Sequence, residues 1–343
     1  MKSQVTLKDI ALKVGVAEMT VSSALRNVGR MGAETRKKII AAADELGYRP
    51  NLAARSIRSG RFGCLALLTS QNHPTPVSLQ MLGGIETIMN KNNLHLILSQ
   101  LADKKVTDNS YMPQILRESM ADGLLIKHDI YIPDEMKNIL AQHHFKIPAI
   151  WINSKHESDC IYPDELDSGR RATEHLINLG HKNIWYLTYC IDKDSHYSIS
   201  DRFNGYKQAM ESAELQPNWL GKGKKELSRS TRLSLIQELF ESDNCPTAIV
   251  TPNTTTAGIA LLAAAKLNIK VPEELSIITF SNEPVDSSGI LLDTMKIPEG
   301  EMGKQAVEML LEKINDHSII QKPYIAKYSL EIGDSCAPPH THI

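Results

Sequence analysis

A short stretch near the N-terminus, TLKDIALKVGVAEMTVSSALRN (residues 6–27), carries side chains that could read the edges of nucleic-acid bases. Glu18 offers a carboxylate that can accept a hydrogen bond from the amino group of cytosine, and Met19 offers an apolar surface for the methyl group of thymine. Ser23 stands where a reader of guanine is expected to carry Arg, and one Arg–guanine pair is worth ~1–3 kcal/mol of discrimination. The stretch therefore indicates base recognition that lacks this strong pair.

No pattern typical of bond-making chemistry accompanies these residues. The sequence contains no Gly-x-x-x-x-Gly-Lys-Ser/Thr, no His-Glu-x-x-His and no Gly-x-Ser-x-Gly. GKGKKE (221–226) lacks the preceding strand that a phosphate loop needs, so we expect a solvated basic loop there. His340 and His342 could bind a stray metal ion, with a disordered terminus as the alternative. We therefore predict that the protein is not an enzyme and has neither a cofactor nor a resident metal.

Three short helices must position the base-reading side chains. Thr6 can begin the first helix, because its hydroxyl can accept from a backbone N–H and Asp9 lies three residues on, where a capping box requires an acceptor. Gly15 provides the turn to a second helix over about 17–26, and a third helix is expected over about 33–46. Two helices joined by a tight turn are typical of a helix-turn-helix, whose second helix enters the major groove. The residues expected to face its interior are Leu7, Ile10, Ala11, Val14, Val21, Ala24, Leu25, Ile39, Ile40, Ala43 and Leu46.

Charge is divided unevenly along the chain. Residues 1–61 contain 12 Lys and Arg against 5 Asp and Glu, which gives this segment a net charge of +7. Because the whole chain carries -2, the remaining residues must carry -9. A basic head on an acidic body is typical of a nucleic-acid-binding module joined to a soluble partner domain, and a plain solvated charge run is the alternative.

The sequence predicts a cytoplasmic protein with no membrane partner. It contains no run of about 18 apolar residues, and its N-terminus has no apolar signal region. The five cysteines are odd in number and far apart, which disfavours a disulfide framework or a zinc site and fits a reducing compartment.

The order of segments in the head resembles that of the lactose-repressor/galactose-repressor family of bacterial transcription regulators. The matching stretches are VTLKDIALKVGV, TVSSAL, ETRKKIIAAADELGYRPN and ARSIRSGR. In that family Arg is usual at the position of Ser23, Asn at that of Arg26, and Ser at those of Ala17 and Gly32, so the resemblance implies an operator that departs from the common half-site. The DNA-binding residues that the resemblance implies in the head are Thr6, Leu7, Glu18, Met19, Thr20, Ser22, Ser23, Arg26, Arg30, Thr35, Tyr48 and Asn51.

Residues 49–61 (RPNLAARSIRSGR) are expected to form a hinge between head and body. A helix this short is marginal alone and should order only when it pairs with its two-fold mate on DNA. By resemblance, Ile57 is the side chain that enters the minor groove and kinks the duplex, with Ala54, Arg55 and Arg58 beside it. A plain flexible linker is the alternative.

From Gly63 the pattern changes to apolar runs that alternate with helical patterns, which is typical of parallel sheets covered on both faces. The number of units fits two doubly wound lobes whose strand ends face a cleft. The expected strands are 64–69, 94–100, 122–128, 147–153, 183–189, 247–253 and 275–281, and the expected helices are 79–92, 111–119, 134–143, 167–179, 202–213, 231–241 and 255–267.

The family resemblance continues over the body and implies a fold like that of the periplasmic sugar-binding proteins, with two lobes, three crossovers and a ligand between them. The predicted fold class is thus a small all-α helix-turn-helix head plus an α/β body. The segment YIAKYSLEI is expected to close the second lobe as a strand. The predicted domains are the head over 1–48, the hinge over 49–61 and the body over 62–343, with lobe one at about 62–162 and 294–321 and lobe two at about 163–291 and 322–336.

Polar side chains at the strand ends are the candidates for effector binding. By resemblance, Arg202 is the residue that clamps effector hydroxyls or carboxylates, because its fork suits bidentate bonding. Carboxylates that the family commonly uses for sugar hydroxyls are absent, so a different sugar, an anionic sugar, a non-sugar ligand and no ligand all stay open. The candidate effector-binding residues are Ser70, His73, Asn153, Arg202, Asn253 and Ser281.

The head and body together favour a homodimeric transcription regulator, most simply a repressor, that binds a pseudo-palindromic double-stranded DNA operator. A small effector, expected to be a sugar or sugar derivative, would close the lobes and so alter the pairing of the two hinges. One alternative is a small-molecule sensor or carrier whose head no longer reads DNA. An enzyme on a doubly wound fold has only the fold in its favour.

Overall fold

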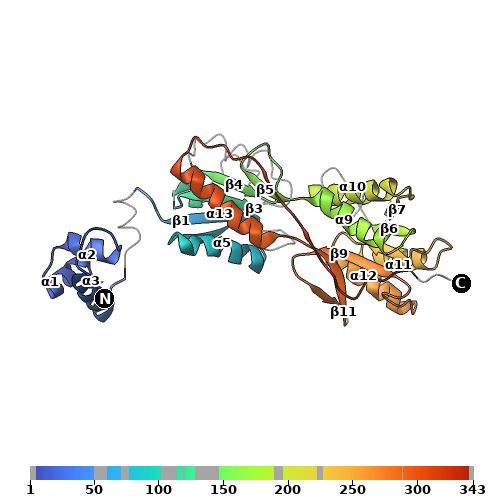
Figure 1. Ribbon diagram of the computed structural model, residues 1–343, viewed down its shortest axis with the longest axis horizontal. Coiled ribbons are helices and arrows are strands. Elements are labelled where there is room, and N and C mark those ends of the chain that lie inside the picture. Colours follow the sequence, from blue (N-terminus) through green and yellow to red (C-terminus); the bar gives the residue numbers. More distant parts are fainter. Residues whose placement is uncertain are drawn as a thin grey trace. The chain divides into compact units, whose positions relative to one another are not determined.

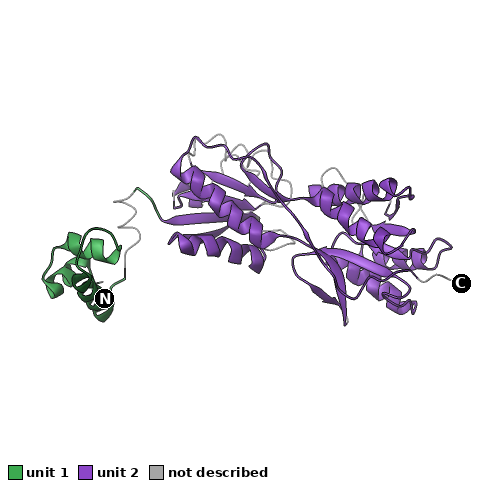
Figure 2. Ribbon diagram, viewed as in Figure 1, with its two compact units in different colours: residues 1–62 green, residues 63–343 purple. Residues whose placement is uncertain are grey.

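The computed structural model forms two compact units, residues 1–62 and residues 63–343 (Figure 2). The helix expected over 134–143 lies outside the described part of the chain. Within the described residues, no helix is long and apolar enough to cross a membrane. The residues that the structure describes are 5–49, 60–70, 77–101, 114–118, 120–127, 147–188, 196–221, 227–287 and 289–339.

Within residues 5–49, the first unit consists of α1 (Leu7–Val14), α2 (Glu18–Leu25) and α3 (Ala33–Leu46), shown in blue in Figure 1. The predicted capping box at Thr6 is confirmed. The Thr6 hydroxyl accepts from the Asp9 backbone N–H at 3.4 Å, and the Asp9 carboxylate accepts from the Thr6 backbone N–H at 2.8 Å. α1 ends at Gly15 in the left-handed conformation that favours glycine, with φ of 75°.

The three helices share a small core in which Ile10, Val21 and Ile39 are fully buried. Ile40 was also predicted to face this core, but the structure leaves its side chain 42% exposed, so that prediction is wrong. Neighbouring residues on an α-helix point about 100° apart, so only one of two adjacent isoleucines can reach the centre of the interface. The apolar spacing therefore identified the helix correctly but assigned one residue too many to its buried face.

The second unit contains two sheets, as predicted. In the first, the described strands follow the order β12-β5-β4-β3-β1-β2 and all pair in parallel. α5 and α13 lie side by side against one face of this sheet (Figure 1), and Ile115 of α7 packs against the other. The bounds are β1 Cys64–Ser70, β2 His95–Leu101, β3 Gly123–Lys127, β4 Ala149–Ile152, β5 Cys160–Pro163, β12 Tyr324–Ala326, α5 Leu79–Lys91, α7 Gln114–Arg117 and α13 Glu299–Asn315.

In the second sheet, the described strands follow the order β10-β11-β9-β8-β6-β7, and β13 also pairs with β11. α9 and α10 cover one face, and α11 and α12 cover the other. The bounds are β6 Ile184–Leu187, β7 Asn218–Leu220, β8 Ala248–Val250, β9 Ser276–Ser281, β10 Val285–Ser287, β11 Ile290–Lys296, β13 Ser329–Glu331, α9 Glu165–Asn178, α10 Tyr197–Ser212, α11 Arg229–Phe240 and α12 Thr254–Lys266.

The division between the lobes differs from the prediction at the last crossing of the chain. YIAKYSLEI is not one strand of the second lobe. Its first part, β12, pairs with β5 in the first sheet, and only β13 joins the second sheet through β11. β11 belongs to the second sheet through Lys296, so the return to the first lobe falls later than the predicted residue 294. An apolar run shows that a strand forms but does not show which sheet it joins.

Glycines allow two helix pairs to pack at backbone distance. On α5, a Cβ added at Gly84 would lie 2.1 Å from the carbonyl oxygen of Gly300 on α13, whereas a Cβ at the neighbouring Gly83 meets nothing within 4 Å. α9 and α10 pack in the same way, since a Cβ at Gly169 would lie 2.1 Å from the carbonyl oxygen of Arg202. Both lobes are thus built around one close helix pair.

We predict opposite effects for alanine at two adjacent positions of α5. Gly84→Ala should lower the free energy of unfolding by ~1–3 kcal/mol or more, because a backbone carbonyl must move to admit the methyl group. Gly83→Ala should raise it by up to ~1 kcal/mol, because it restricts the unfolded chain without a clash. Denaturant titration followed by circular dichroism measures both, and equal effects of the two substitutions would contradict the packing described here.

Candidate functional site

The second helix of the head presents its first turn to solvent. Glu18 and Met19 are exposed, and Met19 keeps 81% of its surface. Thr20, Ser22 and Ser23 are half-buried along the same helix. The long apolar side chain of Met19 gains nothing from the fold of the head, so it is available to a partner surface.

Hydrogen bonds hold the segment that follows α2. The guanidinium of Arg36 on α3 donates to the side-chain amide of Asn27 and, at 3.5 Å, to the carbonyl oxygen of Gly29. Arg26 Nε donates to the carbonyl oxygen of Ser22 at 3.2 Å, which lays this side chain along its own helix. The predicted Arg30 lies exposed on this held segment. Arg36 therefore fastens the segment just after α2 to α3.

The other predicted DNA-binding residues of the head lie at helix ends. Thr6 caps α1 and Leu7 opens it, Thr35 is half-buried in the first turn of α3, and Tyr48 packs against the head's core just after α3. α2 and α3 begin at Ala17 and Gly32, whose side chains offer no oxygen for a cap. Several predicted site residues lie outside the described part of the chain: Asn51, Ala54, Arg55, Ile57, Arg58 and His73.

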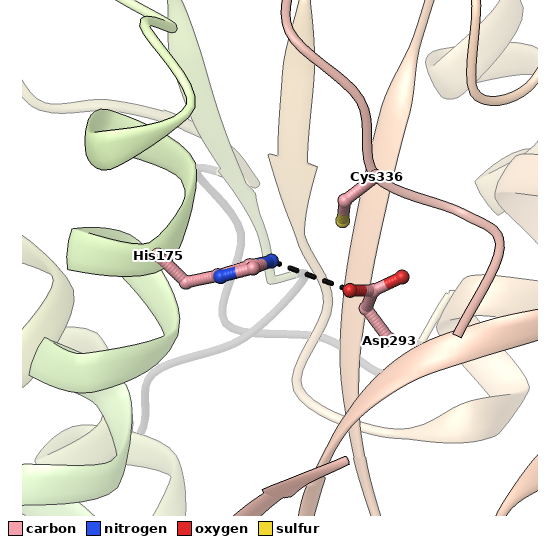
Figure 3. Close-up of side chains that lie close together, drawn as sticks. All are labelled: His175, Asp293 and Cys336. Atoms are coloured by element: carbon pink, nitrogen blue, oxygen red, sulfur yellow. Dashed lines mark ion pairs between the residues drawn. The ribbon is translucent and has the colours of Figure 1, made fainter. Parts of the chain in front are cut away.

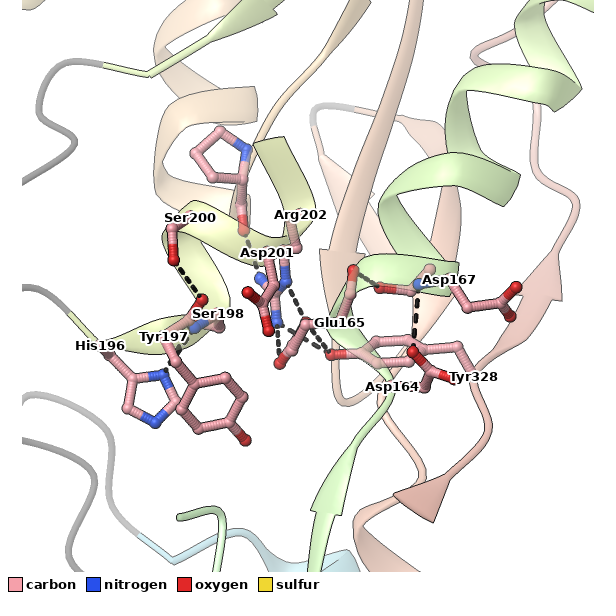
Figure 4. Close-up of polar contacts among 12 residues, drawn as sticks. Asp164, Glu165, Asp167, His196, Tyr197, Ser198, Ser200, Asp201, Arg202 and Tyr328 are labelled. Carbon is pink, nitrogen blue, oxygen red and sulfur yellow. Dashed lines mark hydrogen bonds and ion pairs between the residues drawn. The ribbon is translucent and has the colours of Figure 1, made fainter. Parts of the chain in front are cut away.

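In the second lobe, the guanidinium of Arg202 is buried and bonded to the protein on several sides (Figure 4). Its Nε and Nη2 donate to the two oxygens of Glu165 at 2.5 and 3.1 Å. Nη1 donates to the carbonyl oxygen of Pro252 at 2.6 Å, and Nη2 also contacts the hydroxyl of Tyr328 at 2.9 Å. Arg202 thus joins α9, α10, the loop before α12 and the segment between β12 and β13.

The surroundings of the buried Arg202 guanidinium keep it charged. Burial alone would lower the pKa of Arg202, but the adjacent carboxylate of Glu165 more than offsets this and raises it. Burial, together with Glu165, raises the pKa of Tyr328 well above its ordinary value, so its hydroxyl stays protonated and donates to Glu165 at 2.8 Å. Arg202 was predicted as an effector clamp. In the structure, its guanidinium makes four hydrogen bonds to protein groups and so holds parts of the second lobe together.

Polar contacts cross between the lobes beside this network. Asn153 follows β4 with φ of 60°, and its side-chain oxygen accepts from the hydroxyl of Tyr197 at 3.0 Å. His196 Nε2 lies 3.1 Å from the Asn153 carbonyl oxygen. Lys155 forms an ion pair with Asp201 and lies over the ring of Tyr197, 4.8 Å from its centre. These contacts join the carboxyl end of a first-lobe strand to the first turns of α10.

Two of the remaining strand-end candidates, Asn253 and Ser281, bond the local backbone. Asn253 caps α12, because its side-chain oxygen accepts from the Thr256 backbone N–H at 2.9 Å. The hydroxyl of Ser281, at the end of β9, accepts from the Glu283 backbone N–H at 3.3 Å. Ser70 is the last residue of β1. Among the candidates whose side chains the structure describes, Asn153 forms hydrogen bonds to the opposite lobe.

Sequence reasoning missed the residues that make these contacts, namely His196, Tyr197, Lys155, Asp201 and Glu165. The helix that carries two of them, Tyr197 and Asp201, was expected to begin at Arg202, whereas α10 begins at Tyr197 and His196 is its N-cap. The signal lay in HYSISD, where His196 can cap a helix and its side chain does accept from the Ser198 backbone N–H. An earlier helix start would have placed Tyr197 at a strand-to-helix junction, where ligands and lobe contacts gather.

A helix-turn-helix head on a two-lobed α/β body defines a class of ligand-responsive DNA-binding regulators, and comparison with known proteins agrees. Residues 6–51 match the family described as bacterial regulatory proteins, lacI family, and residues 173–336 match the periplasmic binding protein-like domain. The HTH-type transcriptional repressor PurR of Aliivibrio salmonicida (strain LFI1238) is 28% identical over 321 residues, covering 91% of this chain and 92% of that protein. PurR of Vibrio parahaemolyticus is 29% identical over 318 residues, with the same coverage.

Solved structures show the same fold. The lac repressor dimer bound to operator and the anti-inducer ONPF aligns with a TM-score of 0.76 at 21% identity, over 98% of this chain and 100% of that one. The complex of the transcriptional regulator CelR with cellobiose aligns with a TM-score of 0.63 at 19% identity, over 97% and 100%. The chain belongs to the lacI family of bacterial regulatory proteins, and its homologues are DNA-binding transcriptional repressors rather than enzymes.

We predict that Arg202 contributes to stability before any ligand binds. Arg202→Met strands the buried Glu165 carboxylate, and losing one partner of a buried ion pair costs ~3–5 kcal/mol. The double variant Arg202→Met, Glu165→Met removes both charges and should recover a large part of this loss. Arg170→Met removes a half-exposed partner of Glu174 on the same lobe and should cost at most ~1 kcal/mol. Chemical unfolding of the ligand-free protein measures all three, and an unaltered stability of Arg202→Met would refute the framework role.

Proposed function

We propose that this chain is a homodimeric repressor that binds a pseudo-palindromic operator through two heads and responds to a small effector held between its lobes. The observation that carries the proposal is the exposed first turn of α2, with Glu18 and Met19, within residues 1–61, which carry a net charge of +7. Non-specific affinity for the duplex would come from this charge and specificity from the exposed side chains.

Each head would read a short half-site with an unusual set of side chains. Glu18 accepts from cytosine and Met19 packs on a thymine methyl, while Ser23 provides no strong pair with guanine. Thr20 and Ser22 lie beside them, half-buried, and their hydroxyls can donate to phosphate oxygens. The half-site should therefore differ from those of relatives that carry Arg at the position of Ser23.

Two-fold symmetry follows from the way such heads bind. One head covers only a few base pairs, so a second copy on the opposite half-site is needed for useful affinity, and matched half-sites make the operator a pseudo-palindrome. A solved relative with this fold is a dimer bound to its operator, which supports the same arrangement for this chain.

The effector would act on the contacts between Asn153 and the start of α10. Tyr197 and His196 hold Asn153 from the second lobe, and Lys155 pairs with Asp201 beside them. A ligand that binds here favours one lobe arrangement over another only if it contacts both lobes differently in the two states. The described strand ends offer amide, hydroxyl and aromatic groups, so we propose a small polar effector. A sugar or sugar derivative is one of the classes to be tested.

We predict that Met19 contributes to sequence preference, whereas an equally exposed apolar residue of the head does not. Selection of bound duplexes from a random pool should return one symmetric motif for the full chain. Met19→Ala should relax the preference at one base pair of each half-site and weaken binding roughly tenfold per half-site. Leu12→Ala removes a side chain that is 73% exposed on α1 and should leave motif and affinity unchanged. A pool with no enriched motif would favour a sensor or carrier that does not read DNA.

We predict that Tyr197→Phe weakens the effector response. Thermal melting with a panel of sugars, sugar phosphates and non-sugar polar compounds should identify a ligand that raises Tm. Its affinity should fall roughly three- to tenfold in Tyr197→Phe, because one hydrogen bond across the lobes is worth ~0.5–1.5 kcal/mol. Tyr324→Phe removes a hydroxyl that bonds Glu301 within the first lobe and serves as the control. Equal losses in both variants, or no stabilising ligand, would count against an effector at this contact.

A further inference from the structure

Three side chains of different chemistry converge in the second lobe (Figure 3). His175 comes from α9, Asp293 from β11 and Cys336 from the segment after β13. Their ligand atoms all lie within 4.8 Å of one another, and His175 Nε2 is 3.3 Å from Asp293 Oδ1. Imidazole, carboxylate and thiol are all groups that bind transition metals.

The hydrogen bonds of the described residues leave one buried atom of this cluster without a partner. His175 Nε2 is buried and finds no hydrogen-bond partner there, although Asp293 Oδ1 lies close by. Asp293 is 1% exposed, and its Oδ2 accepts from the backbone N–H of Ser335 at 3.1 Å and from its hydroxyl at 3.3 Å. Ser335 thus fixes the carboxylate with its other oxygen directed toward the imidazole.

The spacing suits a tetrahedral metal ion. Nitrogen and oxygen ligands about 2.0–2.2 Å from Zn²⁺ lie about 3.4 Å apart when the coordination is tetrahedral. The observed 3.3 Å between His175 Nε2 and Asp293 Oδ1 is close to this value. The sulfur of Cys336 donates to the carbonyl oxygen of Ile277 at 3.4 Å and would have to move by about 1 Å to complete the set.

We propose that His175, Asp293 and Cys336 form a three-ligand binding site for a divalent transition metal of the Zn²⁺ type. A thiolate and an imidazole select such ions over Mg²⁺ and Ca²⁺, which prefer oxygen ligands. Three protein ligands leave a fourth position for water. Burial raises the pKa of the Cys336 thiol well above its ordinary value, so the metal must displace a proton from sulfur when it binds.

Metal binding here would fasten the last described segment of the chain to the lobe. Cys336 follows Ser335, which already bonds Asp293, and the backbone N–H of Ala337 donates to the hydroxyl of Ser276 on β9 at 3.0 Å. A metal ion would add a link from this segment to α9 through His175. A ligand that binds only the folded state stabilises it, so the metal should raise the Tm of the protein.

The test uses Co²⁺ as a spectroscopic probe of the full chain at pH 8. His340→Ala and His342→Ala are introduced first, because these histidines could bind a metal ion independently. We expect one Co²⁺ per chain, an absorption band from thiolate to cobalt, and a rise in Tm of several degrees. Cys336→Ser should abolish the band, and His175→Gln should weaken binding roughly tenfold or more.

Cys245→Ser provides the matched control, because Cys245 is also a half-buried free cysteine whose pKa is raised by burial. It should leave stoichiometry and spectrum unchanged. Circular dichroism of each metal-free variant checks folding, and His175→Gln keeps the test decisive should Cys336→Ser fail to fold. Absence of a thiolate band, or a band and affinity that survive Cys336→Ser and His175→Gln, would overturn the site.

Discussion

The buried ion pair between Arg202 and Glu165 is the interaction on which the second lobe depends. It fixes the beginning of α9 to the first turns of α10, and Tyr328 completes it from the segment that returns from the first lobe. The same turns of α10 carry Tyr197 and Asp201, which contact Asn153 and Lys155 across the lobes. The buried ion pair and the contacts between the lobes therefore share one helix, α10.

The head could be predicted from sequence almost completely, because its determinants are local. The Thr6 capping box, the glycine that ends α1 and the span of α3 are each set by a few neighbouring residues. The fold class of the body was equally accessible, since alternating strands and helices leave few arrangements. The error at Ile40 arose because apolar spacing does not distinguish two adjacent isoleucines on one helix.

The sequence did not show which residues far apart in the chain contact one another. The last crossing was misplaced because the sequence of residues 324–331 does not show that β12 and β13 join different sheets. Arg202 was identified as important, yet its partner Glu165 and its role in the lobe's framework emerged only in three dimensions. The cluster of His175, Asp293 and Cys336 has no spacing motif, and its members meet only because α9, β11 and the C-terminal segment pack together. The same limit hid the contact between Tyr197 and Asn153.

The central claim is that residues 1–61 recognise DNA, while the body determines when they bind it. The most direct measurement is a footprint on the chain's own operator, made with the full chain and with a chain that lacks residues 1–61. The account predicts one symmetric protected site for the full chain, with affinity that falls steeply as salt rises, and no protection by the shortened chain. Equal protection by the shortened chain, or protection indifferent to sequence by the full chain, would contradict it.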